Sequence, residues 1–571
     1  MKSLKSRISL LAMCLGIFVV MLDTTIMNIA LPEIQTNLNT SLAAVSWALN
    51  AYTIIFAATC IPLGKLANVY GKKAFYVGAL ILFALGSIFS GLSQNVIFLI
   101  CGRVFQSFGA AVLFPLSMDL AISTQPNRLN RKATLFVGIT QGLASAFGPT
   151  LGGVITQFMG WRWIFLINAP IVLIALILSI YALPNHLPRE ESKIDWLGSG
   201  LTVVALFSLT MALIQFRYWG LSWPIYSLLG IFILTATLFI IWERHVSVPM
   251  IDFSLFNNTN FNLASIATLF GQLLLVGFMV IMPTFLTNMF DKTAFESALL
   301  VTPATMMIFV LSPMAGLLVR RLNPQKLLAL GFLLISFGYW GLASLSTPLN
   351  YSFYIGYCFL IGAGCGVIVG PISVLSTVGF KGSQLTASQS VIGVLRQLGT
   401  VLAVALFVSG LNLNIVNAKN HSLSFACNQI ERVSVSQTEK KHIIKKIKNN
   451  LDHHQTKEAH QNINNTLLNR KDALVNQHYQ RYLTAKGLSS KELPLRIQKE
   501  IKHNIALKIS HSLMQLSNAL DKIQQHIKKE YVQSFTKLYL YAAPVALLIA
   551  LIFFFVPVKP ISLRRPDSEK Q

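Results

Sequence analysis

Long apolar runs separated by short polar connections fill most of the chain. Each run has roughly 20 residues, the length that an α-helix needs to cross a hydrocarbon core about 30 Å thick. Strands of a membrane barrel would instead alternate apolar and polar residues over about ten positions. The runs therefore predict an all-helical integral membrane protein with fourteen transmembrane helices. These helices are expected near residues 8–30, 43–66, 74–93, 96–120, 133–158, 163–183, 197–215, 222–242, 261–285, 295–319, 326–345, 352–378, 387–410 and 538–557.

One polar segment, residues 412–537, separates the last two predicted helices. It is rich in Lys, Asn, Gln and His, and over 493–531 its apolar residues recur at helical spacing. We expect helices there, in a hairpin that runs into the last span. Two interpretations remain open: the segment is a solvated spacer, or it docks on a periplasmic partner or an anionic surface.

Composition and charge narrow the class further. Hydrophobic residues make up 54% of the chain and charged residues 12%, too few charges for the surface of a soluble protein of this length. Outside 412–537, Lys and Arg gather in alternate short connections, for example 72–73, 128–132 and 320–326. Such residues face the cytoplasm, so both termini are expected inside and the segment 412–537 outside. The basic residues orient the helices and do not indicate nucleic-acid binding.

A weak internal repeat divides the chain into two halves. GKLANVYGKK (64–73) and GLLVRRLNPQK (316–326) each place a glycine and a basic turn two spans into a half. Repeated halves are usual in secondary transporters. The predicted organisation is an N-terminal six-helix half at 1–184, two linking helices at 185–245, five helices of the C-terminal half at 246–411, the polar segment 412–537, the last helix at 538–557 and a cytoplasmic tail at 558–571.

Several motifs resemble those of one transporter family. They are LDTTIMNIALP (22–32), GKLANVYGKK (64–73), CGRVFQSFGAA (101–111), GPTLGG (148–153) and LRQLGTVLAVAL (395–406). Their order and positions are similar to those of the major facilitator superfamily, specifically its fourteen-helix drug:proton antiporters of the EmrB/QacA type. The resemblance implies two six-helix halves with two intervening helices.

The resemblance also implies roles for individual residues. Asp23 would handle protons, and Arg103 with Gln106 belongs to the arginine motif of the fourth span. Asn68 stands where the family usually has an acidic residue in the loop between spans two and three. The conformational motifs are the signature loop, with Gly64, Asn68, Gly71, Lys72 and Lys73, and the antiporter motif of the fifth span, with Gly148, Pro149, Gly152 and Gly153.

The physics of a charge in an apolar helix supports a special role for Asp23. Such a residue is costly, so it usually faces a cavity or a partner and marks an ion or substrate path. Counted at 1.5 Å per residue, Asp23 and Arg103 both fall in the outer half of the bilayer. They are expected to pair or to share one cavity, either for proton coupling or as a structural pair that locks the N-terminal half.

The remaining cavity candidates are less specific. Arg396, deep in the thirteenth span, either bonds backbone carbonyls or lines the second half of the cavity. Gln106 and the aromatic residues Phe18, Trp47, Tyr52, Phe285 and Phe337 are further candidates to line it. No acidic residue lies deep in the tenth span, where Glu296 is at the outer edge. This favours monovalent cationic or neutral lipophilic substrates over dications.

The predicted function is a proton-coupled multidrug exporter of the bacterial inner membrane that works by alternating access. The sequence has no Walker phosphate loop, no nucleophile–base pair and no metal-ligand spacing, so we expect no enzyme, metal or cofactor. The expected partners are a small-molecule substrate, protons and the lipid bilayer, with a periplasmic adaptor protein as a further candidate. Two alternatives stay open: an exporter of an endogenous metabolite, lipid or siderophore, and a receptor or scaffold that acts through 412–537.

Overall fold

The structure is a computed structural model in which the described residues are almost all helical and contain no strand. The described residues are 2–126, 130–185, 187, 194–246, 248–290, 292–319, 321–345, 348–433, 437–452, 471–486 and 494–555. Two compact units are present. The first comprises Met1–Leu345, Asn350–Ser409 and Leu538–Gln571, and the second Ser346–Leu349 and Gly410–Lys537.

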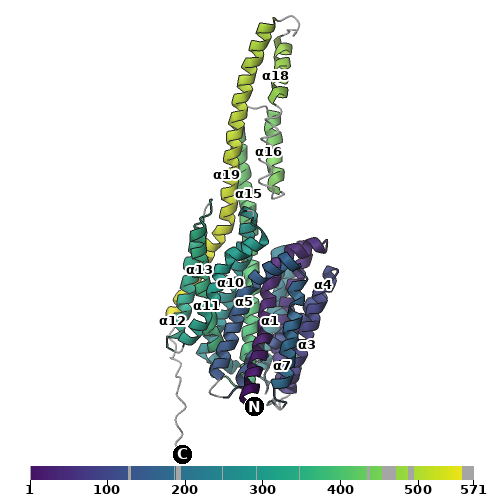
Figure 1. Cartoon of the computed structure of the whole chain (residues 1–571), viewed down its shortest axis with the longest axis vertical. Helices are drawn as coiled ribbons and strands as arrows, with labels where there is room; N and C mark the ends of the chain where they lie inside the picture. Colours follow the sequence, from purple (N-terminus) through teal and green to yellow (C-terminus); the bar gives the residue numbers. More distant parts are fainter. Residues whose placement is uncertain are drawn as a thin grey trace, which may run out of the picture. The chain divides into compact units, whose positions relative to one another are not determined.

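The first unit begins with the helices of the N-terminal half (Figure 1). They are α1 (Lys2–Asn37), α2 (Leu42–Tyr70), α3 (Lys72–Gly91), α4 (Val96–Ser123), α5 (Asn130–Met159), α6 (Trp163–Leu166) and α7 (Asn168–Ala182). Small residues let α3 and α4 approach closely: a Cβ on Gly86 would lie 2.8 Å from the Cα of Gln106. The polar side chains of Arg103 and Gln106 on α4 are fully buried within this half.

Two helices follow that half, α8 (Trp196–Trp219) and α9 (Trp223–Glu243). Asp195 caps α8 through the Gly198 backbone N–H at 2.9 Å and also accepts the Trp242 indole N–H at 2.9 Å. Its carboxylate therefore ties the start of α8 to the end of α9. Both helices carry many exposed apolar side chains, as expected of a surface that faces lipid.

The C-terminal half repeats the arrangement. Its elements are η1 (Phe253–Asn257), α10 (Thr259–Phe290), α11 (Ala294–Leu318), α12 (Pro324–Ala343), α13 (Tyr351–Leu375), α14 (Ser383–Ala403) and the π-helical turn η2 (Val404–Val408). The last stretch of α19 (Leu495–Phe555) supplies the sixth helix. There Ser336 Oγ donates to the Ala543 carbonyl at 2.8 Å, which fixes this stretch against α12.

The connection from α9 to α10 is joined to α14 by a carboxylate. Asp252 accepts hydrogen bonds from the Ser254 N–H and from Gln384 Nε2, each at 2.9 Å. Burial alone would raise the pKa of Asp252, but the hydrogen bonds from Ser254 and Gln384 lower it below its ordinary value. The carboxylate therefore stays charged and holds the linker to the start of α14.

Thirteen helices in the described part of the chain are long and apolar enough to cross a membrane. The one predicted span that is not among these thirteen is the fifth, 133–158, which corresponds to α5, a helix of 30 residues. Its glycines, serines, threonines and glutamines lower its hydropathy, and many of them lie on the side that packs against α1 and α11. For example, Thr150 Oγ1 lies 3.0 Å from Thr302 Oγ1 of α11. The all-helical fold class is confirmed.

The second unit contains α15 (Ser409–Glu431) from Gly410 onward, α16 (Gln437–Asp452), α18 (Lys471–Lys486) and the first part of α19 (Figure 1). Asn414 Nδ2 donates to the Ser534 carbonyl at 3.0 Å, and the rings of Phe425 and His526 stack with centroids 4.0 Å apart. These contacts pair α15 with α19. The prediction of helix over 493–531, continuing into the last span, is confirmed for the described residues, because α19 is one helix of 61 residues. The hairpin expected within 493–531 is wrong, since α19 runs through its described residues without a turn.

Candidate functional site

A buried ion pair joins α1 to α4. Arg103 Nη1 lies 2.6 Å from Asp23 Oδ2, and both side chains are fully buried. Gln106, one turn after Arg103, donates from Nε2 to Asp23 Oδ1 at 2.8 Å and accepts from Arg103 Nη1 at 2.6 Å. The carboxylate therefore has a counter-charge on one oxygen and an amide donor on the other. Asp23 and Arg103 do pair, one of the two arrangements expected from their depth.

Two residues that the sequence did not single out complete this network. Asn168, at the start of α7, donates to Ser87 Oγ of α3 at 3.1 Å and reaches Asp23 Oδ1 at 3.5 Å. Ser87 Oγ also receives the amide of Gln106 at 3.3 Å and donates to the Phe165 carbonyl at 2.8 Å. The sequence signal that could have indicated this part of the network was Asn168 itself, an asparagine within the apolar run 163–183. The network thus joins four helices around one carboxylate.

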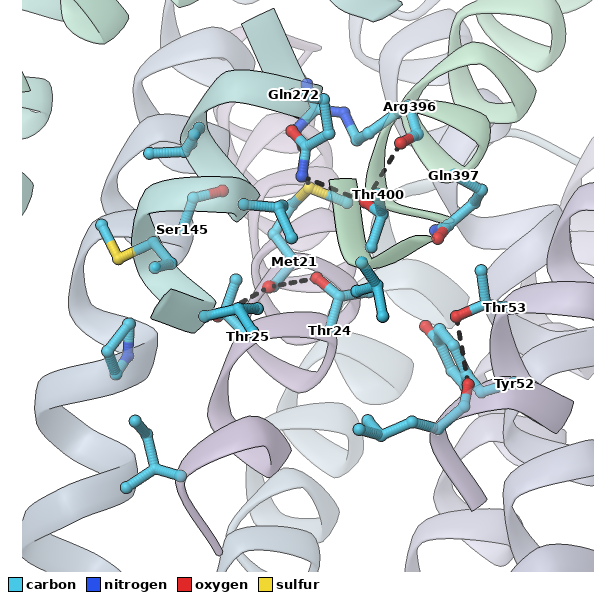
Figure 2. Close-up of a pocket in the computed structure, with 18 of the residues that line it drawn as sticks. Met21, Thr24, Thr25, Tyr52, Thr53, Ser145, Gln272, Arg396, Gln397 and Thr400 are labelled. Atoms are coloured by element: carbon cyan, nitrogen blue, oxygen red, sulfur yellow. Dashed lines mark hydrogen bonds between the residues drawn. The ribbon is translucent and has the colours of Figure 1, made fainter. Parts of the chain in front are cut away.

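A cavity of about 80 Å³ lies next to the ion pair, with space for a few water molecules. Both halves line it: α1, α2, α4 and α5 from the first, and α10, α14 and η2 from the second. Figure 2 shows Gln272 and Thr400 side by side, facing Met21, Thr24 and Thr25 of α1. Arg103 lines the cavity and Asp23 does not, so the carboxylate contacts the cavity lining through its ion pair with Arg103.

The other candidates for the cavity divide into two groups. Tyr52 and Arg396 line it, whereas Trp47 and Phe285 do not. Phe285 is fully buried, with its ring 5.3 Å from that of Phe290. Phe18 is half-buried and Phe337 is 51% exposed on the surface. Because these helices are apolar all round, the sequence could not tell which of their faces turns inward.

A second polar cluster links the halves on the predicted cytoplasmic side. Lys72 Nζ lies 2.5 Å from Asp119 Oδ2, and this carboxylate is fully buried. Thr386 Oγ1 of α14 lies 2.5 Å from Asp119 Oδ2 and 2.9 Å from Asn68 Oδ1. Its single hydroxyl proton is therefore shared between two acceptors of the N-terminal half. Asn68 takes part as a hydrogen-bond acceptor where the family usually has a charge.

Removing this hydroxyl should loosen the contact between the halves. Thr386→Val keeps the shape of the side chain but deprives Asn68 and Asp119 of a buried donor, a loss of about 1–1.5 kcal/mol. We expect the thiol of Cys60, buried beside Ser390 in the same interface, to react roughly tenfold faster with N-ethylmaleimide. The measurement uses a chain whose other cysteines are replaced by serine. Thr377→Val is the control, because its hydroxyl donates to the Ser373 and Val374 carbonyls at the end of the preceding helix α13. Equal labelling of both variants contradicts the prediction.

Comparison with known proteins identifies the fold family. Residues 13–404 match the family model described as Major Facilitator Superfamily. The chain belongs to this superfamily. The family match ends before α15, so the larger segment of the second unit, Gly410–Lys537, lies outside it.

Curated relatives of this major facilitator protein include proteins named for export or resistance. It is 29% identical to the tetracenomycin C resistance and export protein of Streptomyces glaucescens, over 64% of this chain and 69% of that one. It is 28% identical to the multidrug export protein EmrB of Escherichia coli and to the fatty acid resistance protein FarB of Neisseria gonorrhoeae, in each case over 68% of this chain and 77% of the relative.

A solved structure supports the same fold. A bacterial homologue of the human lysosomal transporter Spinster, in an inward-facing and unoccupied conformation, matches with a TM-score of 0.53 and 14% identity. The match covers 97% of this chain and 99% of the other. At this identity the likeness concerns the major facilitator fold alone.

Glycines of the signature loop and of the antiporter motif lie at close contacts between helices. Gly64 faces Ser390 Oγ of α14, where a Cβ would come within 2.5 Å. In α5, a Cβ on Gly148 would lie 2.7 Å from Thr25 Cβ, and one on Gly152 would lie 2.9 Å from the Ile26 carbonyl oxygen. These two glycines therefore pack against α1 of their own half.

The other motif residues have different neighbours. Gly153 faces Ala298 of α11 in the opposite half, where a Cβ would lie 3.2 Å away, and Pro149 lines the cavity. Gly71 takes a φ of 122° between α2 and α3, which favours glycine. Lys73 Nζ donates to the Leu183 carbonyl at 2.7 Å, at the C-terminal end of α7. Its positive charge complements the dipole of that helix end.

Proposed function

We propose that this transporter exports lipophilic small molecules in exchange for protons, with Asp23 as the proton acceptor. The observation that carries the proposal is a fully buried carboxylate, held by Arg103 and Gln106, one residue away from a cavity lined by both halves. A buried charge of this kind is costly to keep and is a usual feature of proton relays in transporters. The protein would lie in the bacterial inner membrane with both termini in the cytoplasm.

The two protonation states of Asp23 would differ in what they hold together. The charged carboxylate binds Arg103 and fixes α1 to α4. A protonated Asp23 no longer balances the guanidinium, so the attraction between these helices falls. Proton binding would then favour a second arrangement of the halves, and proton release on the other side would restore the first. This is the differential interaction that a conformational switch requires.

The contact around Thr386 fits alternating access. In this conformation α14 is joined to α2 and α4 on the predicted cytoplasmic side, and the cavity is too small for a drug-sized compound. Export would require that this contact break and the cavity enlarge toward the cytoplasm. Gly64 and Gly153, at contacts between the halves, would allow such a rearrangement because they add no bulk.

The relatives support export of small molecules without selecting one. Their names cite tetracenomycin C, multiple drugs and fatty acids. Export of an endogenous metabolite, lipid or siderophore therefore remains the alternative within the same class. The segment Gly410–Lys537, outside the family match, is where a periplasmic adaptor or a scaffold role would have to be sought.

Neutralising the ion pair as a whole tests the role of Asp23. Asp23→Asn alone would leave Arg103 charged and buried, so the informative variant is Asp23→Asn with Arg103→Gln. In vesicles with an imposed pH gradient, we expect this variant to lose uphill transport of a lipophilic fluorescent dye and to keep downhill exchange. Proton movement is followed with an internal pH indicator.

Glu296→Gln is the matched control, because this carboxylate is exposed and caps α11 with Thr293. It should keep gradient-driven transport near the wild-type rate. If the double variant still accumulates dye against its gradient, proton coupling does not involve Asp23. If neither the wild-type protein nor the Glu296→Gln control moves any lipophilic dye in either direction, the proposed export of such compounds is wrong.

A further inference from the structure

Arg396 is a cation without a counter-ion beside the cavity. Its Nη2 lies 3.4 Å from Gln141 Oε1, a long contact, and its Nη1 lies 3.4 Å from the sulfur of Met21, a weak acceptor. Its guanidinium also lies 5.7 Å from the centre of the Phe114 ring. Among the described residues, no carboxylate lies within ion-pair distance of it. By contrast, Arg103 is neutralised by Asp23.

Three residues that line the cavity hold buried polar atoms without a partner among the described residues. These atoms are Arg396 Nε, Arg103 Nη2 and the Tyr52 hydroxyl. The two guanidinium nitrogens can only donate, and the phenol can donate as well. Buried donors left unpaired are costly, so the molecule that fills the cavity is expected to bring acceptors.

The rest of the lining is apolar or uncharged. Leu275, Val276, Met279 and Val280 of α10 form an apolar wall, and Gln272, Gln397 and Thr400 supply neutral polar groups. None of the lining residues is Asp or Glu. With Arg103 balanced by Asp23, the net charge around the cavity is that of Arg396.

We infer that the substrate of this cavity is a lipophilic organic anion whose negative group, such as a carboxylate, pairs with Arg396. The inference rests on the proposed export function and gives its substrate class. A lipophilic cation would be repelled by Arg396 and would find no carboxylate in the lining, which removes the cationic part of the substrate range expected from the sequence. A neutral compound would leave the guanidinium without a counter-charge.

Arg396 and the proton site are separate in this arrangement. Arginine keeps its proton, so Arg396 offers the same charge whether or not Asp23 is protonated. Coupling would then act through the conformation that the Asp23–Arg103 pair stabilises. An inside-negative membrane potential also favours the outward movement of an anion.

Binding of three matched naphthalene compounds tests the inference. They are 2-naphthoate, its neutral methyl ester and the cation (2-naphthylmethyl)trimethylammonium. Isothermal titration calorimetry on the full chain, purified in a neutral detergent at pH 7, should show 2-naphthoate binding at least about tenfold more tightly than the ester, as expected for a hydrogen-bonded charge. The cation should bind most weakly.

Three variants separate charge recognition from a structural role. Arg396→Gln should bring 2-naphthoate to within about twofold of the ester, whereas Arg396→Lys should retain most of the preference because it keeps the charge. Arg244→Gln, which removes an exposed arginine outside the cavity, should change nothing. A residue that only supports the fold would alter the binding of all three compounds equally.

The inference is overturned if wild-type protein binds the ester or the cation as tightly as 2-naphthoate. It is also overturned if Arg396→Gln keeps the preference for the anion. The assay contains no proton gradient, so a transporter that lacks proton coupling would still show the preference. Failure of the proposed coupling and failure of the anion inference therefore give different results.

Discussion

Arg103→Leu is expected to destabilise the folded protein by about 3–5 kcal/mol, the cost of breaking a buried ion pair by removing one partner. The substitution leaves Asp23 fully buried with hydrogen bonds from the amides of Gln106 and Asn168 and with no counter-charge among its described neighbours. It also removes the contact of the guanidinium with the Tyr52 ring, whose centre is 4.1 Å away. The thermal midpoint of the detergent-purified protein, followed by tryptophan fluorescence, should fall clearly.

A double-mutant cycle separates the interaction energy of the two charges from the contribution of each side chain alone. Asp23→Asn with Arg103→Gln removes both charges, so it should recover most of the stability that Asp23→Asn alone or Arg103→Gln alone loses. The partly exposed surface pair of Lys292 and Glu296, 3.6 Å apart, is the matched control. Breaking that pair should cost at most about 1 kcal/mol, since its charges stay in water. A double variant no more stable than Arg103→Gln alone would show that the buried charges are not what the fold depends on.

Most helix positions could be predicted from the apolar runs. The run 295–319 corresponds to α11 at Ala294–Leu318, and the run 74–93 to α3 at Lys72–Gly91. These succeed because about 20 residues of low polarity have few alternatives to a membrane helix. The predicted span 387–410 ends too early, because the sequence turns polar there. In the structure the helix continues as α15 to Glu431. Its pairing with α19, through Asn414 and Phe425, does not require a continuous apolar run.

Within the site, the ion pair of two charged residues could be predicted from the sequence, whereas several of its uncharged polar residues were missed. Asp23 and Arg103 stand out in apolar spans, and their similar depth was enough to expect a pair. Ser87, Asn168 and Thr386 were missed, because small polar residues are frequent in membrane helices and often bond their own backbone, as Thr53 does with the Leu49 carbonyl. Whether such a group faces a carboxylate depends on the rotation of its helix, which the packing of neighbouring helices decides.

The same dependence on packing explains why one glycine of α13 should be irreplaceable. A Cβ on Gly362 would lie 2.6 Å from the Cα of Ala304 in α11 and would overlap the Ala304 carbonyl oxygen. Real Cβ atoms do not approach backbone atoms so closely, so α13 would have to move away from α11 along a tightly packed contact. We expect Gly362→Ala to cost at least about 3 kcal/mol, at the upper end for overpacking. Little folded protein should then be recovered from the membrane by size-exclusion chromatography.

A second glycine of the same helix provides the control. A Cβ on Gly356 would meet nothing within 4 Å, and Gly356 is exposed. Gly356→Ala should therefore leave the thermal midpoint unchanged or raise it slightly, because alanine favours the helix by about 0.8–1 kcal/mol over glycine. Ala304→Gly should not rescue Gly362→Ala, since the atoms in the way belong to the backbone and remain after the side chain is removed. Rescue by that substitution, or equal behaviour of the two alanine variants, would mean that α11 and α13 do not pack as closely as described.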